Sequence, residues 1–600
     1  MLYGFPGPSI TYCDDITTHI TVDDEKEAVK FMQPRLNRME EWARRWKFSF
    51  AADKCMAMAF TRRSKPPPNP VFFISGQIIP FVTETKFFGL IFDYKLTWKP
   101  HIDYVVDRVN KCKNIFTILS KHKFGPKIST LITLFKAVVL SRVDYGIIIF
   151  GGAAPSNLKH IDVALRSIMR SILGAFKSTP TEVLYSELGL EPVALRRVAL
   201  AERYIIELGH KPCNAAYSLG YNLFHGMPTF KKWGVPCLNS FIVDLRERGF
   251  NIFSEPPDTM PRFPPYSPWS DPPFEAKFFS LSKGKAKENP ALVKGLFASI
   301  CAALPQTALS VYTDGSLLPE SNSTAGAFFI PSLQFDSSFH MVRNTSVFSA
   351  ELIAIKEALN YVYSLDSFHD EVRVFTDSES SIKSLLSAAG KHPIVAEILR
   401  IMNCLKSTGV KTTLAWIPSH TGIPGNEKAD ALALAECKNR SRLVKNRLSP
   451  PEQISLASAE WRERRRIQLR VCQKPSVQLM SQPSLIPWFF HKKRFISTIL
   501  HRLRTGHNRL NAFRHKFDDT IDPLCRFCHN ELEKFEHFLT NCQHFRYKIT
   551  KLKSFCRLHN LHLNSLTVLG LDPEIDSHLQ YSLRKLLIKL IKSSELIFII

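Results

Sequence analysis

The chain has 600 residues, a formal net charge of +25 and a sequence pI of about 9.5. Its length exceeds what one hydrophobic core supports, and 45% hydrophobic with 22% charged residues is the composition of a globular protein. We therefore expect a multidomain α/β protein of three or four folded units, whose excess of Lys and Arg favours binding to polyanions.

The sequence indicates neither export nor a membrane contact. The opening MLYGFPGPSI lacks the charged and apolar regions of a secretory signal, and Lys585, Lys589 and Lys592 interrupt the apolar residues of 583–600. The 13 cysteines show no paired framework, which favours a reducing compartment. We expect an intracellular protein of the cytoplasm or nucleus that ends in an amphipathic helix packed on the unit before it.

Residues 9–20, SITYCDDITTHI, predict a strand, a tight acidic turn and a second strand. This pattern resembles the YxDD hairpin in the palm of reverse transcriptases, which implies that Asp14 and Asp15 bind magnesium. Further on, EEWARRWKFSFAADKCMAMAF and TKFFGLIFDYKLTW resemble later palm and primer-grip motifs of LINE-type (non-LTR) retrotransposon polymerases, and LFKAVVLSRVDYGIIIFG resembles their thumb. We assign residues 1–100 to a partial palm and 101–250 to a helical thumb or connection region.

Polymerase activity is not expected of this chain unaided. It needs an earlier palm aspartate and nucleotide-binding fingers, and residue 1 falls directly before the YCDD turn. Asp14 and Asp15 are therefore expected to be vestigial metal ligands on a surface that still binds nucleic acid. Cys13 stands where the resemblance leads us to expect alanine or a similar small residue.

Proline marks two connecting regions. Repeated prolines from Pro256 to Pro273 restrict φ and remove N–H donors, so 251–300 is predicted to be an extended linker. Residues 441–515, which contain the run SPPEQ, are predicted to be a basic linker or helical region.

Basic residues gather in four clusters: RRWK around Arg44, and residues 461–470, 491–494 and 501–510. We expect at least one of them to contact nucleic acid. The alternative is that these runs are the solvated faces of helices.

Residues 305–440 combine strand and helix patterns. LSVYT, AGAFFI and SFHMV predict an antiparallel start to a sheet, and VRVFTD and TTLAWIP predict two further strands, which gives a mixed five-stranded sheet. Apolar residues at steps of three or four predict a helix over 346–365, and a last helix is expected from about 426 to 435.

Four carboxylates belong to these elements: Asp314 at the end of the first strand, Glu351 beside the apolar stripe of the helix, Asp377 after VRVFT, and Asp430 in the first turns of the last helix. Ligands in α/β sheets collect at strand ends. Four acids in one place are costly unless divalent cations neutralise them, and carboxylate oxygens suit magnesium or manganese. The pattern predicts two-metal phosphodiester chemistry.

The order TDGS, AEL on a helix, TDS and SHTGIPGNEKAD resembles a type 1 ribonuclease H domain. The resemblance implies that Asp314, Glu351, Asp377 and Asp430 bind two Mg²⁺ or Mn²⁺ ions, and that His420 assists proton transfer or product release. It also implies an endonuclease that hydrolyses the RNA strand of an RNA–DNA hybrid. Such a duplex would be recognised through 2′-hydroxyl and backbone contacts across the minor groove, without sequence specificity.

Residues 516–600 contain a second metal-ligand pattern, C-x2-C-x8-H-x4-C. Thiolates and an imidazole at this spacing suit a structural Zn²⁺, with a CxxC pair on one side and a helix-borne His and Cys on the other. The pattern resembles the motif that follows ribonuclease H in some LINE-type elements. Its ligands are Cys525, Cys528, His537 and Cys542, with His529 or His544 as competing candidates.

Together these patterns predict part of a LINE-type retrotransposon polyprotein. Its competent part is a ribonuclease H, between a polymerase remnant and a small zinc-binding, α-rich tail, and its partners are RNA, DNA and their hybrid. Protein partners are not indicated. Two alternatives stay open: a catalytically silent nucleic-acid-binding relic, and an active polymerase if upstream sequence supplies the missing palm. An integrase-like use of the fold is disfavoured because Glu351 is the second acid and His420 precedes the last.

Overall fold

The chain divides into two compact units, one formed by residues 1–197 with 465–600 and the other by 198–464. Each unit is described by itself. The computed structural model describes residues 9–12, 15–61, 69–121, 125–211, 214–227, 236–253, 271–281, 283–305, 307–365, 369–387, 392–470 and 488–600.

A mixed six-stranded sheet organises the 198–464 unit, in the order β10-β9-β8-β11-β12-β7. Strand β8 pairs antiparallel with β9 and β9 with β10, whereas β8, β11, β12 and β7 run parallel. All six residues of β11, EVRVFT, are buried, as expected of a strand that is covered on both faces. The strands are β7 (Glu275–Phe278), β8 (Ala308–Leu318), β9 (Ser323–Ile330), β10 (Phe335–His340), β11 (Glu371–Thr376) and β12 (Lys411–Trp416).

The expected five strands gain a sixth from the region that was predicted to be a linker. Residues Glu275–Phe278 pair with β12, and two helices follow before β8. The reason is tertiary: β12 would otherwise be a sheet edge with unpaired backbone groups, and a short extended segment satisfies them. Residues 254–270, which hold most of the prolines, lie outside the described residues.

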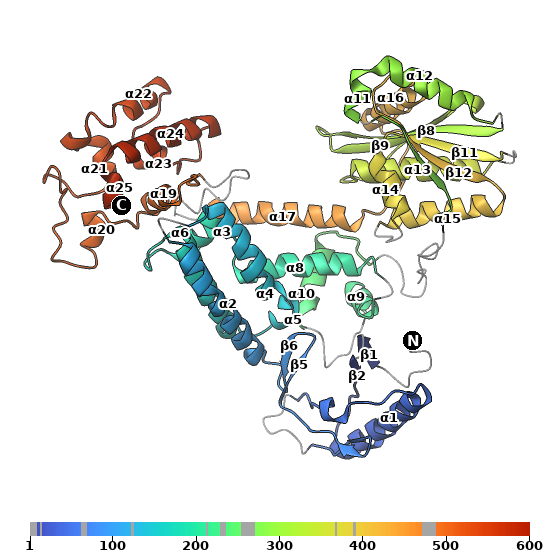
Figure 1. The fold of residues 1–600 in the computed structure, drawn as a ribbon, viewed down its shortest axis with the longest axis horizontal. Helices are drawn as coiled ribbons and strands as arrows, with labels where there is room; N and C mark the ends of the chain where they lie inside the picture. The colour runs from blue at the N-terminus through green and yellow to red at the C-terminus, as the bar shows by residue number, and fades with distance from the viewer. Residues whose placement is uncertain are drawn as a thin grey trace. The chain divides into compact units, whose positions relative to one another are not determined.

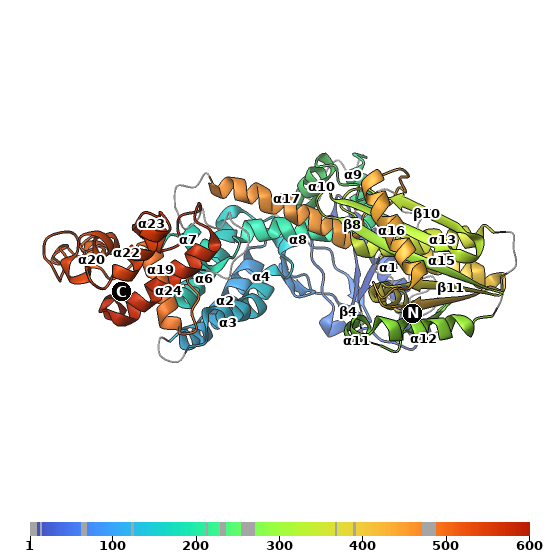
Figure 2. The ribbon, with the colours of Figure 1, turned by 90° about the horizontal axis from the view of Figure 1, so that it is seen from above.

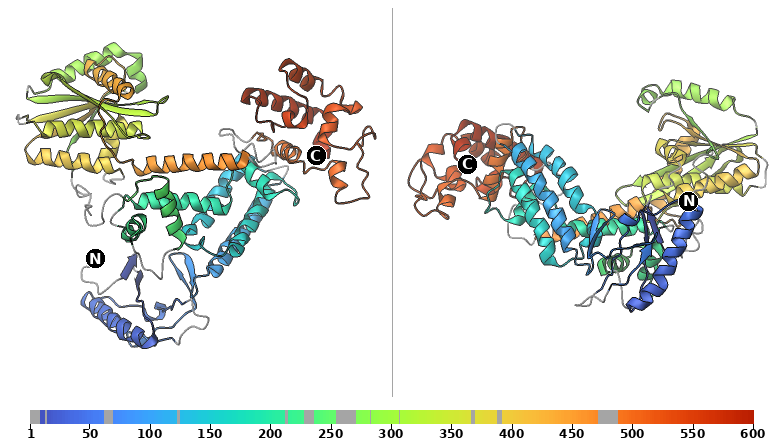
Figure 3. Two further views of the ribbon diagram at one scale, coloured as in Figure 1. Left: turned by 180° about the vertical axis from the view of Figure 1, so that it is seen from behind. Right: turned by 60° about the horizontal axis from the view of Figure 1, so that its bottom comes forward.

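Helices cover both faces of this sheet (Figure 1). One face carries α13 (Val347–Tyr363), α14 (Glu379–Leu386) and α15 (Pro393–Ser407), and the other carries α11 (Lys283–Glu288), α12 (Pro290–Ala302) and α16 (Pro424–Asn439). Figure 3 shows the same two layers from behind. Helix α13 begins where the Ser346 side chain accepts a hydrogen bond from the Ser349 N–H, and its Ala350, Ile353 and Ala354 are buried on the sheet.

The same unit contains a smaller helical core. Helices α8 (Val193–Leu208), α9 (Tyr217–Phe224), α10 (Pro236–Glu247) and α17 (Pro450–Arg470) bury Ile205, Leu245, Phe253 and Ala457 together. Arg248 is buried and pairs with Glu202 and Glu460, which ties α8 and α17 to this core.

The other unit opens with the expected hairpin. Strands β1 (Ser9–Tyr12) and β2 (Asp15–Thr18) are antiparallel, with Tyr12 opposite Asp15. Asp15 is exposed, whereas Cys13 and Asp14 lie outside the described residues. Two-stranded ribbons and helices follow: α1 (Glu25–Arg45), β3 (Phe73–Ile74), β4 (Gln77–Ile78), β5 (Glu84–Phe87), β6 (Leu90–Asp93), α2 (Lys99–Leu119), α3 (Ile128–Leu134), a π-helical stretch (Phe135–Leu140), α4 (Ser141–Asp144), α5 (Ile147–Phe150), α6 (Pro155–Leu173) and α7 (Thr181–Leu188).

The C-terminal helices of this unit pack together, as Figure 2 shows from above. They are α19 (Arg494–Thr505), α20 (Asn511–Arg514), α21 (Phe535–Thr540), α22 (Thr550–Leu558), α23 (Ser565–Val568), α24 (Ser577–Ser593) and α25 (Leu596–Ile599). Helix α24 is the expected amphipathic helix, because Leu583, Leu587 and Leu590 are buried and it packs on α22 and α23. No described helix is both long and apolar enough to cross a bilayer.

Three arginines of the expected nucleic-acid-binding clusters, Arg494, Arg502 and Arg504, are buried in α19 instead. Arg494 donates to the carbonyls of Ser171 and Ile172 near the end of α6, and Arg502 donates to those of Gly174 and Ile600. Guanidinium groups carry several donors in a fixed fork, and here they satisfy carbonyls that helix ends leave unpaired. These residues are therefore structural, and we no longer assign them a contact with nucleic acid.

Candidate metal centres

The strand register brings two of the predicted acids side by side. Strands β8 and β11 are parallel, and their last pair is Thr313 opposite Thr376. The next residue of each chain segment is an aspartate, Asp314 or Asp377, so both stand at the carboxyl end of the parallel pair. Strand β8 itself continues to Leu318 because residues 314–318 pair with β9, so Asp314 lies within a strand and not at its end as expected.

Glu351 reaches the same place from α13. Gly315 follows Asp314, and a Cβ there would lie 2.5 Å from the backbone nitrogen of Glu351, so the helix approaches the strand this closely because residue 315 is glycine. Ligand atoms of Asp314, Glu351 and Asp377 all lie within 4.8 Å of one another. Asp314 and Glu351 are buried and Asp377 is half-buried.

Burial and mutual repulsion act on this cluster. Burial, then the charges of Asp377 and Asp430, raise the pKa of Asp314 to about 7, although the Gly315 N–H partly offsets them. Burial, then the charge of Asp314, raise the pKa of Glu351 well above its ordinary value. Three acids held this way form a site that favours cations or protons.

Asp430 stands at the edge of the cluster. It lies on α16 and is close enough to raise the pKa of Asp314, but its side chain is 34% exposed and it does not join the three-carboxylate group. His420 comes from the loop before α16 with a left-handed φ of 52°, and its Nδ1 lies 3.6 Å from Asp430 Oδ2. His420 is itself 68% exposed.

The donor set fits hard divalent cations. Carboxylate oxygens from three elements converge, which is the ligand type that Mg²⁺ and Mn²⁺ prefer. Among the described residues, Glu351 Oε2 is buried without a hydrogen-bond partner, and a buried oxygen of this kind needs a cation or a proton. Asp15 belongs to neither metal-ligand group found among the described residues.

A second group lies in the C-terminal part. Ligand atoms of Cys525, Cys528, His537 and Cys542 all lie within 4.8 Å of one another. Cys525 Sγ and Cys542 Sγ are 3.9 Å apart, and Cys528 Sγ is 3.1 Å from His537 Nε2. His537 is on α21 as expected, whereas Cys542 follows that helix.

Thiol chemistry and outer contacts distinguish these four residues. Burial opposes ionisation of Cys528, but the Asn530 N–H, Cys525 and His537 lower its pKa to about 7, while burial raises the pKa of Cys542 to about 12. His544, a competing candidate, contacts Glu595 and Lys548 and stacks on Phe527 instead. His529 lies outside the group.

Two supporting residues were not predicted from the sequence. Glu531 Oε2 lies 2.9 Å from His537 Nδ1, the carboxylate–histidine arrangement that orients a metal-bound imidazole. Gly315 lets α13 approach Asp314. The glycine of TDGS was a usable signal for a close approach, whereas Glu531 carries no signal in the sequence, since an exposed acid near a CxxC pair is common.

Known proteins bear on the first of these sites. The RNase H family model matches residues 306–438, which contain all four acids and His420. Residues 306–438 are thus an RNase H domain with an acidic triad, of which Asp314 and Glu351 are buried.

The chain as a whole is distantly similar to reverse transcriptases of the non-LTR retrotransposons jockey and X-element. It is 27% identical over 212 residues to the RNA-directed DNA polymerase from mobile element jockey of Drosophila funebris, a match that covers 35% of this chain and 23% of that protein. It is 27% identical over 185 residues to the probable RNA-directed DNA polymerase from transposon X-element of Drosophila melanogaster, covering 30% of this chain and 20% of that protein. The match thus spans about a fifth of the length of these curated relatives.

Proposed function

We propose that this chain is a metal-dependent ribonuclease that cuts the RNA strand of an RNA–DNA hybrid. The observation that carries the proposal is the convergence of Asp314, Glu351 and Asp377 within 4.8 Å, in a domain that matches the RNase H family. We take residues 271–453 as its folded extent, since β7 and α12 pack in the core of the sheet and Glu452 in the first turn of α17 accepts a hydrogen bond from the Ser346 N–H.

The acids and the histidine of the site would have different roles. Asp314, Glu351, Asp377 and Asp430 would hold two Mg²⁺ or Mn²⁺ ions, which when bound lower the pKa of an attacking water and stabilise the leaving 3′ oxygen. The Gly315 N–H lies near both carboxyl groups and partly offsets the rise in the pKa of Asp314 and of Glu351. His420, beside Asp430 and open to water, would exchange a proton at the ring nitrogen that does not face Asp430.

The substrate class follows from the family and the charge. Hybrid duplexes are A-like, so a protein meets their 2′-hydroxyls and phosphates across the minor groove rather than base edges. The net charge of +25 favours such a polyanion. Cleavage without sequence preference is the expected result.

Cleavage of a labelled hybrid by the purified chain with Mg²⁺ tests the proposal. Asp377→Asn should lower the rate by at least about 100-fold, because it removes a proposed metal ligand. Asp370→Asn is the matched control, since Asp370 is an exposed acid just before the other end of β11 and should leave the rate unchanged. If the wild-type chain binds the hybrid but never cuts it, the silent relic is the correct interpretation.

The Cys₃His group we assign to a structural Zn²⁺. Two sulfurs that bind one tetrahedral Zn²⁺ at about 2.3 Å lie roughly 3.8 Å from each other. The Sγ atoms of Cys525 and Cys542 are 3.9 Å apart, which matches this spacing. The purified chain should contain one zinc per molecule and lose it when Cys525 and Cys528 are changed to serine. Cys404→Ser, an exposed cysteine of the other unit, should keep it. A wild-type chain free of zinc would end this assignment.

A further inference from the structure

Helix α12 precedes the residues matched by the RNase H family, yet it packs beneath the acid cluster. Its Val293 and Phe297 are buried. The Phe297 ring lies 5.2 Å from that of Phe375 and 6.3 Å from that of Tyr312. Phe375 stands two residues before Asp377, and Tyr312 stands two residues before Asp314 and so shares a face of β8 with it.

The next contact of α12 reaches the loop that carries His420. A Cβ built at Gly422 would lie 2.1 Å from Lys294 Cε and 2.6 Å from its Nζ, so the end of the lysine side chain, with its last methylene carbon nearest, lies directly against the glycine backbone. Gly422 has a φ of 79°, a conformation that side chains other than glycine rarely adopt. The glycine therefore both turns the loop and admits the stem.

This loop is short and bounded by fixed points. The Thr421 hydroxyl donates to the Pro418 carbonyl at 2.9 Å, and buried Ile423 begins α16. His420 and Gly422, two residues apart, both have left-handed φ. The three atoms nearest to a Cβ built at Gly422 all belong to Lys294.

Lys294 is exposed, and its ammonium has no ion-pair partner among the described residues. No ion pair therefore explains where this side chain lies. Long cationic side chains commonly pack their methylene carbons on a neighbouring surface. The packing of the stem on Gly422 is thus the contact that the geometry explains.

We infer that Lys294 is a positioning residue for the nuclease: its stem braces the loop at Gly422 and so fixes where His420 stands beside Asp430. This inference rests on the proposed function. It also makes α12 a working part of the catalytic domain, although α12 lies before the family-matched range.

Variants of Lys294 in the full-length chain separate the stem from the charge. Lys294→Ala removes the stem and should lower kcat about 10-fold with KM nearly unchanged, a fraction of the roughly 100-fold that a general acid–base group contributes. Lys294→Met keeps the stem without the charge and should restore most of kcat. Lys287→Ala, an exposed lysine of α11, is the matched control and should behave as wild type.

Every outcome decides the inference. If Lys294→Met is as slow as Lys294→Ala, or if KM changes and kcat does not, the charge matters and bracing is wrong. If both variants cleave normally, it is also wrong. Amide hydrogen exchange at Thr421 and Gly422 gives a readout without activity: faster exchange in Lys294→Ala than in Lys294→Met supports bracing even for a wild-type chain that cuts nothing, which would refute only the proposed function.

Discussion

Asp314 has a pKa that makes the metal-free site sensitive to pH. Its folded value is raised to about 7 by burial and by Asp377 and Asp430, whereas an unfolded aspartate titrates near pH 4. Between about pH 4 and about pH 7 the folded state therefore holds a proton that the unfolded state has lost, so stability of the metal-free domain falls as pH rises through this window.

Magnesium should replace that proton. We predict that saturating Mg²⁺ raises the melting temperature of the RNase H domain by about 5 °C at about pH 8, and by much less at about pH 5, where protons already neutralise the acids. Differential scanning fluorimetry of the purified chain at both pH values measures this.

Glu351→Gln supplies the control, since it removes one of the two buried carboxyl groups of the cluster and should reduce both the pH dependence and the gain from Mg²⁺. Equal stabilisation by Mg²⁺ at the two pH values would show that the ion binds somewhere other than this cluster.

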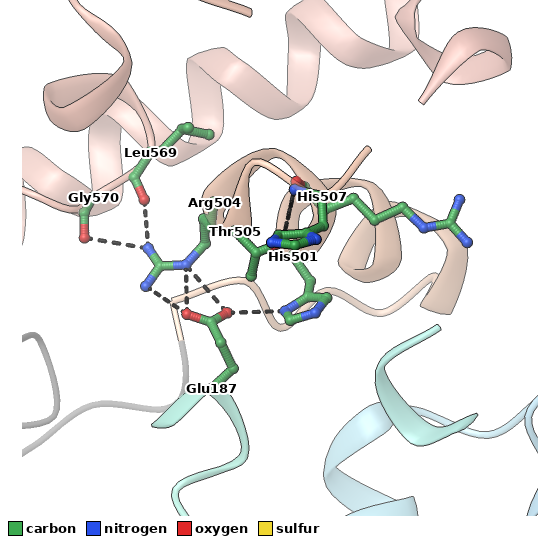
Figure 4. Close-up of polar contacts among 8 residues, drawn as sticks. Glu187, His501, Arg504, Thr505, His507, Leu569 and Gly570 are labelled. Carbon is green, nitrogen blue, oxygen red and sulfur yellow. Dashed lines mark hydrogen bonds and ion pairs between the residues drawn. The ribbon is translucent and has the colours of Figure 1, made fainter. Parts of the chain in front are cut away.

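Helix α19 is joined to α7 and to residues 569–570 of its unit through buried polar contacts (Figure 4). Arg504 Nε and Nη2 donate to Glu187 of α7 at 3.1 Å, its Nη1 donates to the carbonyls of Leu569 and Gly570, and His501 Nδ1 lies 3.3 Å from Glu187. Burial works against the Glu187 charge, but Arg504 and His501 outweigh it and hold its pKa below the ordinary value. The pair is thus ionised and fully enclosed.

Arg504→Ala should destabilise this unit by about 3 kcal/mol or more, because it leaves the buried Glu187 charge without its partner. The double variant Glu187→Leu with Arg504→Met should recover much of that loss, since replacing both members of a buried pair by apolar groups is often nearly neutral. Thermal unfolding followed by circular dichroism measures both. Arg509→Ala, an exposed arginine of the same run, should have little effect, and equal losses for Arg504→Ala and Arg509→Ala would contradict the role given to Arg504.

Elements with strong periodicity could be predicted from the sequence, and those decided by distant contacts could not. The buried strand at 371–376 and the helix at 347–363 lie within a few residues of their predicted bounds, because VRVF and the apolar steps of the helix are local signals. The strand β7 was missed, since EAKF becomes a strand by pairing with β12. The basic run at 501–510 was expected to contact nucleic acid or else to be a solvated helix face, but Arg502 and Arg504 are buried against carbonyls and a carboxylate of segments distant in the sequence.

The candidate site was predictable to the same extent. Asp314, Glu351 and Asp377 follow from recognisable motifs, and they do converge. The edge position of Asp430 and the extension of β8 beyond Asp314 depend on pairing with β9 and on where α16 begins, which the sequence does not encode locally. Lys294 carries no signal in the sequence, because its partner Gly422 is more than 100 residues away.

At the scale of the whole molecule, the RNase H domain packs against elements that lie on both sides of the family-matched range. Before it, β7 pairs with β12 and α12 packs under Tyr312 and Phe375. After it, Glu452 of α17 accepts a hydrogen bond from the Ser346 N–H at 2.6 Å, at the start of the helix that carries Glu351. A carboxylate at a helix N-terminus satisfies an unpaired donor and opposes the helix dipole.

These contacts predict how fragments behave. A fragment of residues 198–464, one compact unit, should fold cooperatively and cut the hybrid at a rate close to that of the whole chain. A fragment of residues 306–438 lacks β7, α12 and Glu452, so the edge of β12, the rings of Tyr312 and Phe375 and the start of α13 all lose their partners. This fragment should therefore melt at least about 10 °C lower and cleave at least about 10-fold more slowly. Calorimetry and cleavage assays on the two fragments measure this. A 306–438 fragment as stable and as active as the longer one would show that the domain needs none of the added elements to fold or to cleave.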